Sequence, residues 1–339
     1  MNGETESKNE AIVSASAGLL VVFPCLNEET YLERLVTSFV ASLDGQDAHF
    51  VIVDGGSTDQ SPQIAQRLSQ KYAQVSFLSN PHRLQSSAVN LAVRQFGEGK
   101  EFLVRVDVHA DYPADYCQRL VEEANRNGAD SVVVAMVAEG RGWFQKAVAI
   151  AQNSILGNGG SVHRRTGVGG HWVDHGHHAL MRLEPFRAVH GYDETFSHNE
   201  DAELDWRLCA AGYKIWLTDA TCVRYFPRSR PFGLLKQYFS YGCGRARNIM
   251  KNGIRPKIRQ LLPAIVLPAC LSVFLFPVTA LALVPVLVWA GLCVAFGLWL
   301  GRDEKLHIAL AVGVAAMIMH LGWSTGFLRC LICRKGNCS

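Results

Sequence analysis

One long part of this sequence contains no charged residue. In a chain of 339 residues, residues 261–300 include no Asp, Glu, Lys, Arg or His. A single helix over that tract would be roughly 60 Å long, about twice the hydrocarbon core of a bilayer, so two shorter apolar segments fit better. After the polar break at residues 301–305, residues 306–328 are again nearly uncharged and favour a third segment.

These segments predict a membrane domain over residues 261–328, with two to three spans and a short tail at 329–339. Three spans would place the positive charges of that tail outside the cell, against the usual preference for positive charge in the cytoplasm. As an alternative to three spans, one segment is re-entrant or lies in the membrane interface. A buried core helix is a further alternative, but the two histidines in residues 306–328, His307 and His320, count only weakly against a span.

Several other common signals are also missing. Residues 1–17 form a polar tail without the apolar core of a signal peptide, which predicts a cytoplasmic folded part and reduced thiols for the ten cysteines. Cys330 and Cys333 have no partner pair at zinc spacing. The glycine clusters at 157–160 and 167–170 lack the Lys-Ser/Thr of a P-loop and are expected to be flexible loops.

The net charge of +3 is too small to indicate nucleic-acid binding, but its distribution is uneven. No acid occurs between Asp219 and Asp303, and residues 233–260 form a basic juxtamembrane segment. Such a segment fits a cytoplasmic face against anionic lipid, at about 1 kcal/mol per charge. It fits a lipid diphosphate site or a purely topological role equally well. The basic residues on the approach to the apolar tract, within this segment and just before it, are Arg224, Arg228, Arg230, Lys236, Arg245, Arg247, Lys251, Arg255, Lys257 and Arg259.

Short runs of β-forming residues alternate with amphipathic stretches before this segment. This alternation predicts an α/β domain over residues 18–232, with a mostly parallel sheet and flanking helices. The predicted strands are residues 18–23, 50–53, 75–78 and 102–106, and the predicted helices are 31–43, 61–72 and 85–96.

Polar residues follow three of the predicted strands. Asn27 and Glu28 come after the first strand, Asp54 after the second and Asp107 after the fourth. Parallel sheets bind ligands at the carboxyl ends of their strands, so we expect these side chains to surround one site. Asp107 and His109 stand on alternate residues and are predicted to share a divalent cation, for which the imidazole favours Mn²⁺ over Mg²⁺.

Two adjacent carboxylates, Glu200 and Asp201, come just before an apolar stretch with helical spacing. This position favours an acid held at a helix entrance, where it can act as a general base. Glu200 either orients the acceptor or a water near the metal, or only caps the helix. The histidine-rich segment at 171–178 favours acceptor contacts or simple loop polarity over a second metal site, because its spacing is irregular.

The ordered set Phe23-Pro-Cys-Leu-Asn-Glu-Glu, Val53-Asp-Gly-Gly-Ser-Thr-Asp, Arg105-Val-Asp-Val-His and Asn199-Glu-Asp resembles the inverting family 2 glycosyltransferases of GT-A fold. The match covers about residues 19–230. With its apolar tail, the chain is most similar to the bacterial glucosyltransferases of succinoglycan and other exopolysaccharide biosynthesis, whose metal motif likewise has Asp-x-His.

The resemblance implies a role for each matching residue. Asp107 and His109 fall on the metal motif, and Asp201 falls on the general base. Asp54 is expected to take the uracil or ribose of a UDP-sugar. The donor-binding residues implied are Pro24, Asn27, Glu28, Asp54, Arg83 and Asp107.

The sequence departs from the family pattern at two of these positions. Many members have a second Asp where this chain has Gly55, so the uridine contact rests on Asp54 alone. His109 replaces the usual second metal-motif Asp, which leaves Mn²⁺ and Mg²⁺ both open. The Gln-x-x-Arg-Trp motif of processive synthases is absent, since Tyr-Phe-Ser-Tyr follows Gln237, and this predicts transfer of one sugar per encounter.

The resemblance therefore implies a membrane enzyme that moves a hexose from a UDP-sugar to a polyprenyl-diphosphate-linked saccharide. The donor sugar is expected to be glucose and the linkage β-1,3, at the cytoplasmic face of a bacterial inner membrane. Two alternatives remain open. One is a polyprenyl-phosphate sugar synthase, and the other is a non-catalytic scaffold or export subunit that keeps a nucleotide-sugar fold.

Overall fold

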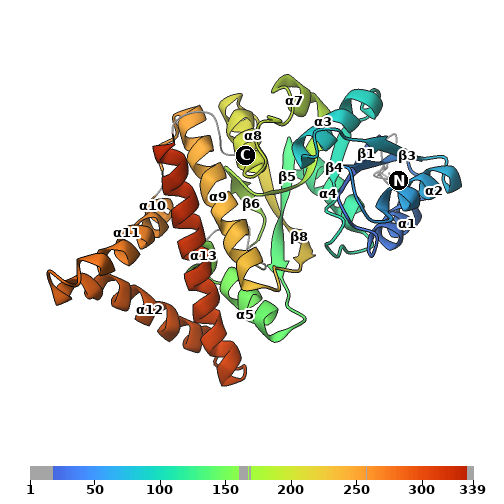
Figure 1. Ribbon diagram of the computed structural model, residues 1–339. Coiled ribbons are helices and arrows are strands. Elements are labelled where there is room, and N and C mark those ends of the chain that lie inside the picture. Colours follow the sequence, from blue (N-terminus) through green and yellow to red (C-terminus); the bar gives the residue numbers. More distant parts are fainter. Residues whose placement is uncertain (1–17, 160–166, 168, 257, 334–339) are drawn as a thin grey trace, which may run out of the picture.

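One mixed β-sheet organises the first two thirds of the chain (Figure 1). The computed structural model describes residues 18–159, 167, 169–256 and 258–333, so the predicted polar tail at 1–17 and most of the tail at 329–339 lie outside the described residues. In that part, the sheet has eight strands in the order β3-β2-β1-β4-β7-β5-β8-β6. The strands are β1 (Leu19–Cys25), β2 (Ala48–Asp54), β3 (Val75–Ser79), β4 (Phe102–Arg105), β5 (Ser131–Ala138), β6 (His171–Val173), β7 (His177–Arg182) and β8 (Ile215–Tyr225).

Helices cover both faces of this sheet. One apolar core joins the sheet to α1, α2 and α4, and a second core joins its other face to α3, α7 and α8. The continuous apolar strands β1 and β2 suit this arrangement, because their side chains are buried on both faces. These helices are α1 (Leu32–Ser42), α2 (Ser61–Lys71), α3 (Gln85–Phe96), α4 (Tyr116–Asn127), α7 (Leu183–Ala188) and α8 (Glu200–Ala210).

The sheet topology places the predicted site. Strands β1, β2, β3 and β4 pair in parallel, whereas β7 joins β4 and β5 in antiparallel fashion. The strand order reverses at the β1–β4 pair, since β2 and β3 lie on one side of β1 and β4 on the other. Open α/β sheets bind ligands at such a point, outside the carboxyl ends of the strands. The predicted mostly parallel α/β architecture is confirmed, and each predicted strand and helix is present with ends shifted by at most a few residues.

The rest of the chain is helical and lies at one end of the sheet (Figure 1). Two of its described helical segments are long and apolar enough to cross a membrane, Ala280–Leu300 and Leu306–Ile332, and Leu261–Leu275 is a shorter apolar helix. The elements in this part are α5 (Trp143–Gln152), α6 (Ile155–Asn158), α9 (Pro231–Asn252), α10 (Ile258–Ala264), α11 (Val266–Leu271), η2 (Ser272–Leu275), η3 (Ala280–Leu283), α12 (Val284–Leu300) and α13 (Leu306–Ile332).

Helices α9 and α13 run side by side with their backbones in close contact (Figure 1). A methyl group built on Gly242 of α9 would lie 2.1 Å from the carbonyl oxygen of Trp323, and one on Gly326 of α13 would lie 2.0 Å from that of Phe239. Only glycine allows backbones to approach so closely. The two helices are therefore held together by packing that a side chain at either position would break.

We expect Gly242→Ala to destabilise the α9–α13 pair by about 1–3 kcal/mol, because the added methyl group overlaps a backbone atom that cannot move alone. Thermal unfolding of the detergent-solubilised protein measures this loss. Gly291→Ala in α12 is the matched control, since nothing lies within 4 Å of a methyl group there. The control should be neutral or gain about 0.5–1 kcal/mol from better helix propensity. Equal behaviour of the two variants would contradict the close packing.

Candidate active site

A cavity of about 1770 Å³ opens at the carboxyl ends of β1 and β4 and continues between the C-terminal helices. Seven of the predicted site residues line it. Asn199, the residue before α8, and Arg83 both have positive φ, which non-glycine residues adopt at a cost. The predicted residues in the lining are Pro24, Glu28, Arg83, Asp107, His109, Glu200 and Asp201.

Two predicted donor residues, Asn27 and Asp54, do not line this cavity. Asp54 is buried, and its carboxylate accepts hydrogen bonds from the backbone N–H groups of Gly56 and Ser57. Asn27 accepts a hydrogen bond from the Thr58 N–H at 2.8 Å. The Asp54 contacts close its own β2–α2 loop, and the Asn27 contact joins the β1–α1 loop to that loop. In this structure both residues shape the rim of the site rather than its surface.

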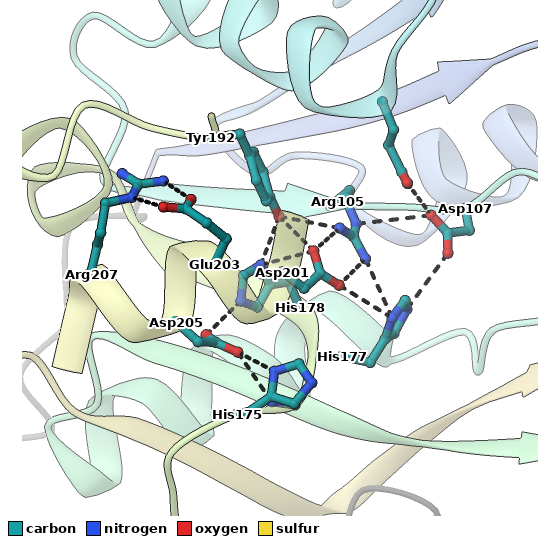
Figure 2. A network of polar contacts seen from close by, with 12 residues as sticks. Arg105, Asp107, His175, His177, His178, Tyr192, Asp201, Glu203, Asp205 and Arg207 are labelled. Atoms are coloured by element: carbon teal, nitrogen blue, oxygen red, sulfur yellow. Dashed lines mark hydrogen bonds and ion pairs between the residues drawn. The ribbon is translucent and has the colours of Figure 1, made fainter. Parts of the chain in front are cut away.

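A buried arginine holds the predicted base. Arg105, the last residue of β4, is 3% exposed and donates two hydrogen bonds to the carboxylate of Asp201, one of them at 3.0 Å (Figure 2). Its Nε lies 3.9 Å from Oδ1 of Asp107. Burial by itself would raise the pKa of Asp201, but the charges of Arg105 and His178 outweigh it and hold that pKa well below its usual range. Asp201 is thus a fixed, ionised carboxylate.

Two neighbouring histidines of β7 complete the surroundings of Asp201 (Figure 2). The ring of His177 lies between Asp107, at 3.6 Å, and Asp201, at 3.8 Å. Burial and the charge of Arg105 lower the pKa of His177 to about 4, so this ring is neutral at pH 7. His178 is fully buried and contacts Asp205 at 2.6 Å. Burial opposes its protonation, but Asp205 and Asp201 raise the pKa of His178 overall.

The predicted metal ligands lie on the donor side of the cavity. Gln85 donates a 2.6 Å hydrogen bond to Asp107, and His109 contacts Glu28 through Nδ1 at 2.9 Å. The hydrogen bond with Glu28 raises the pKa of His109, and burial works against it. No cluster of three or more His, Cys, Asp or Glu side chains suited to a metal occurs among the described residues. A two-residue site of this kind fits a cation that takes its other ligands from a bound diphosphate.

Glu200 is the first residue of α8 and lines the cavity. In the part of the chain that the structure describes, its carboxylate makes no hydrogen bond with another side chain. Burial and the adjacent charge of Asp201 raise the pKa of Glu200 to about 7. The two carboxylates therefore differ: Asp201 is oriented and weakly basic, whereas Glu200 has no ion pair among the described residues and is more basic.

Sequence reasoning did not single out Arg105, Tyr192 or Asp205. A signal for Arg105 was available, because a charge within an otherwise apolar predicted strand has to find a buried partner. Of the two interpretations favoured for the histidine-rich segment, acceptor contacts and loop polarity, loop polarity is wrong for His177 and His178. Both belong to strand β7, and their rings contact the carboxylates described above.

Two models of known protein families match the parts of the chain that contain these motifs. The model of "Glycosyl transferase family 2" matches residues 20–189, which contain the β1, β2 and β4 strand ends. A second model, "Glycosyl transferase family group 2", matches residues 109–301. The chain belongs to glycosyl transferase family 2. It is therefore a hexosyltransferase, and the predicted enzyme class is confirmed.

Two similar proteins each match 94% of this chain. The succinoglycan biosynthesis protein ExoA of Rhizobium meliloti is 53% identical over 94% of this chain and 96% of that protein. A dolichyl N-acetyl-α-D-glucosaminyl phosphate 3-β-D-2,3-diacetamido-2,3-dideoxy-β-D-glucuronosyltransferase of Methanococcus voltae is 23% identical over 94% of this chain and 97% of that protein.

Solved structures share the fold of this family 2 enzyme. The mannosyltransferase PcManGT from Pyrobaculum calidifontis, solved in complex with GDP-Man and Mn²⁺, superposes with a TM-score of 0.59 at 15% identity, over 90% of this chain and 86% of that one. The predicted GT-A fold is confirmed by this likeness together with the family match. The two long apolar helical segments and the ExoA relative indicate a membrane protein.

The His178–Asp205 pair predicts a pH-dependent contribution to stability. The folded-state pKa of His178 is raised, so the pair stabilises the fold fully below the ordinary value of 6.5 and loses this contribution as the pH rises through the raised value. The pKa of Asp205 is lowered from 3.8, so the contribution also requires a pH above about that value.

Asp205→Asn should therefore lower the free energy of unfolding by about 3–5 kcal/mol at pH 5.5, and by less at pH 8.5. Denaturant unfolding at the two pH values measures the difference. Asp44→Asn serves as control, because Asp44 is exposed, and its effect should stay within about 0.5 kcal/mol. A loss in Asp205→Asn of the same size at both pH values would argue against a charged pair.

Proposed function

We propose that this enzyme transfers a hexose from a UDP-sugar to a saccharide carried on polyprenyl diphosphate, with inversion at the anomeric carbon. The single observation that carries the proposal is the continuity of the cavity. One end is polar and holds Asp107 and Asp201, and the other end runs between apolar helices. A donor that is a charged nucleotide and an acceptor that is a lipid need such a two-sided site.

The polar end suits a nucleotide sugar. Pro24, Glu28 and Arg83 line it, and the loops that carry Asn27 and Asp54 form its rim. Asp107 and His109 would hold a divalent cation, Mn²⁺ or Mg²⁺, together with the donor diphosphate. When bound, such a cation neutralises the charge that develops on the departing UDP. PcManGT, which has the same fold, was solved with GDP-Man and Mn²⁺, which is consistent with this assignment.

Asp201 accepts the proton of the acceptor hydroxyl as that oxygen attacks the anomeric carbon. Its bonds to Arg105 fix the direction of the carboxylate and keep it ionised before the acceptor arrives. The low pKa that results makes Asp201 a weak base, so positioning provides most of its contribution. Glu200, one residue earlier in the same cavity wall, orients the acceptor hydroxyl or a nearby water. No covalent enzyme intermediate is needed for inversion.

The other end of the cavity suits a lipid diphosphate. Three basic side chains, Arg228, Lys236 and Arg245, line the cavity together with Asp201. The part of the lining that comes from α11, α12 and α13 is mainly apolar. One cavity thus offers acidic, basic and apolar surfaces, which suit a sugar, a diphosphate and a hydrocarbon chain. The apolar residues include Val266, Val288, Trp289, Leu292, Phe296 and Trp323.

The relatives support a lipid-linked acceptor and an exopolysaccharide product. ExoA of Rhizobium meliloti is a succinoglycan biosynthesis protein, and the Methanococcus voltae relative acts on a dolichyl-linked sugar. We assign glucose as the donor sugar and β-1,3 as the linkage on the resemblance to that exopolysaccharide subgroup. The enzyme would act at the cytoplasmic face of a bacterial inner membrane, where UDP-sugars are available.

Direct transfer to a polyprenyl phosphate is the second candidate. A dolichol-phosphate mannosyltransferase of Pyrococcus furiosus is 31% identical, but over 35% of this chain only. An undecaprenyl-phosphate arabinose-derivative transferase of Edwardsiella ictaluri is 29% identical over 40%. Because each of these matches covers less than half of this chain, whereas the Rhizobium meliloti and Methanococcus voltae relatives match 94% of it, the acceptor that already carries a sugar is the better assignment.

Asp201→Asn should lower the transfer rate by about 10²–10⁴-fold, because the variant cannot take the acceptor proton. Binding of UDP, measured by calorimetry, should change little, since Asp201 is assigned to the acceptor hydroxyl and not to the nucleotide. Glu200→Gln is the matched variant at the neighbouring position and should retain more activity. If Asp201→Asn kept near-normal turnover while Glu200→Gln lost it, the base would be Glu200.

Membranes that contain the enzyme should transfer label from UDP-glucose to a polyprenyl diphosphate sugar and not to polyprenyl phosphate. Lipid extraction and chromatography separate the two products. EDTA should abolish the reaction, and Mn²⁺ or Mg²⁺ should restore it. Label on polyprenyl phosphate would favour the second candidate, whereas transfer to short free sugars at the same rate would remove the argument for a lipid acceptor.

A further inference from the structure

The long apolar helix α13 is covered along both of its halves, by α5 of the catalytic domain and by α9. Its first half packs against α5, where Phe144 and Ala147 meet Ile308 and Val312 in one buried cluster. Its second half packs against α9 through the glycine contacts described above. Half of its most apolar window is buried inside the protein, compared with 17% for the segment Ala280–Leu300.

Both ends of α13 are tied to the same side of the molecule. Before its start, Glu304 forms an ion pair with Lys146 of α5 at 3.3 Å. Near its end, Phe327 and Cys330 pack in one cluster with Ala246 of α9. Helix α9 is in turn fixed to the catalytic domain, because Lys251 pairs with the buried Glu203 of α8 at 2.7 Å.

These contacts conflict with a helix that crosses the bilayer. A crossing helix has its two ends about 30 Å apart on opposite sides of the hydrocarbon. Lys146 beside the first half of α13, and Lys236 and Arg245 on α9, would then be drawn into or across the hydrocarbon together with the catalytic domain. Charged groups are expensive there and rarely occur. The contacts of α13 therefore argue against a crossing orientation and favour one along the membrane surface.

The two remaining apolar segments leave α13 and meet away from the catalytic domain (Figure 1). The first begins beside the end of α13, where Ser324 donates a 3.0 Å hydrogen bond to the carbonyl of Ala264. The second, α12, returns to the start of α13, where Gly297 contacts Gly313. Between them lies the turn at residues 276–279, in which Val278 is 84% exposed.

The length of the first segment decides how far this hairpin reaches. The helix Leu261–Leu275 extends for roughly 22 Å at 1.5 Å per residue, less than the ~30 Å of a hydrocarbon core, and Figure 1 shows it oblique to α13. Pro263 also interrupts its hydrogen bonding. A hairpin with one arm this short enters the bilayer without reaching the far surface.

We propose that residues 261–300 form a re-entrant wedge in one leaflet, with the turn at 276–279 inside the hydrocarbon, and that the chain does not cross the membrane. The partner of this apolar surface is the lipid leaflet that faces the catalytic domain. This inference rests on the membrane attachment in the proposed function. The active-site cavity passes between the wedge and α13, so the lipid acceptor enters sideways from that same leaflet.

Cysteine labelling in membrane vesicles tests the wedge. The parent chain has the exposed Cys209 and Cys333, together with Cys338, replaced by serine. Single cysteines are then introduced as Val278→Cys at the turn, Asp303→Cys before α13 and Gln66→Cys on the exposed surface of α2 as the control for the catalytic side. Inside-out and right-side-out inner-membrane vesicles are treated with a membrane-impermeant maleimide, and labelling of the parent chain is subtracted.

We expect Asp303→Cys to react only in the vesicles in which Gln66→Cys reacts, and Val278→Cys to react in neither until detergent is added. Reaction of Val278→Cys from the side opposite Gln66→Cys would show that the hairpin crosses, and reaction of Asp303→Cys from that side would show that α12 crosses. Reaction of Val278→Cys on the same side as Gln66→Cys would place the turn in water. Each of these results would overturn the proposal.

The attachment itself is tested separately by sedimentation at high salt. Recovery of the protein with the membranes, combined with any of the three contrary labelling results, would overturn the wedge and leave the proposed function intact. Recovery in the supernatant would overturn both the attachment and the wedge. If Gln66→Cys reacted in right-side-out vesicles, the cytoplasmic assignment would fail, but the comparison of Asp303→Cys with Gln66→Cys would still decide whether α12 crosses.

Discussion

The ion pair between Arg105 and Asp201 is the contact on which the arrangement of the active site depends. A guanidinium that is 3% exposed has no water to replace a missing partner, and removal of one member of a buried pair typically costs about 3–5 kcal/mol. Arg105 ends β4 in the middle of the sheet, and Asp201 stands in the first turn of α8. Their bond therefore fixes the helix entrance against the strand end that carries Asp107.

The polar contacts around this pair connect the two halves of the reaction. His177 contacts both Asp107, on the donor side, and Asp201, on the acceptor side. His178 contacts Asp201 and pairs with Asp205, and both His178 and Asp205 are fully buried. A shift of the base would therefore disturb the groups that face the donor diphosphate. This shared set of contacts explains how a residue of β4, two histidines of β7 and a helix entrance act as one site.

Contacts between segments distant in the chain also decide the surroundings of the C-terminal helices. Strongly apolar composition made residues 261–328 candidates for membrane insertion, and two segments have the length to cross. Hydropathy, however, measures only the free energy of moving a segment out of water. Packing against a protein surface and insertion into lipid both remove a segment from water, so hydropathy does not distinguish them. Helix α13 packs its apolar side chains against α5 and α9 and also contacts α10, α11 and α12. Its composition alone therefore does not indicate whether protein or lipid surrounds it.

The sequence by itself determined the strands β1 to β4 and the helices α1 to α3, because the period of its apolar residues reports which faces are buried. It also determined which acids follow these strands, and the ordered set of motifs that contains Asp54, Asp107 and Asp201 carried the resemblance to the family. Only the tertiary structure decided that Arg105 pairs with Asp201 across 96 residues, that Asp54 satisfies its own loop, and that His177 and His178 belong to a buried strand. Such pairings depend on which segments the sheet order brings together, and local periodicity contains no information about partners that are distant in the chain.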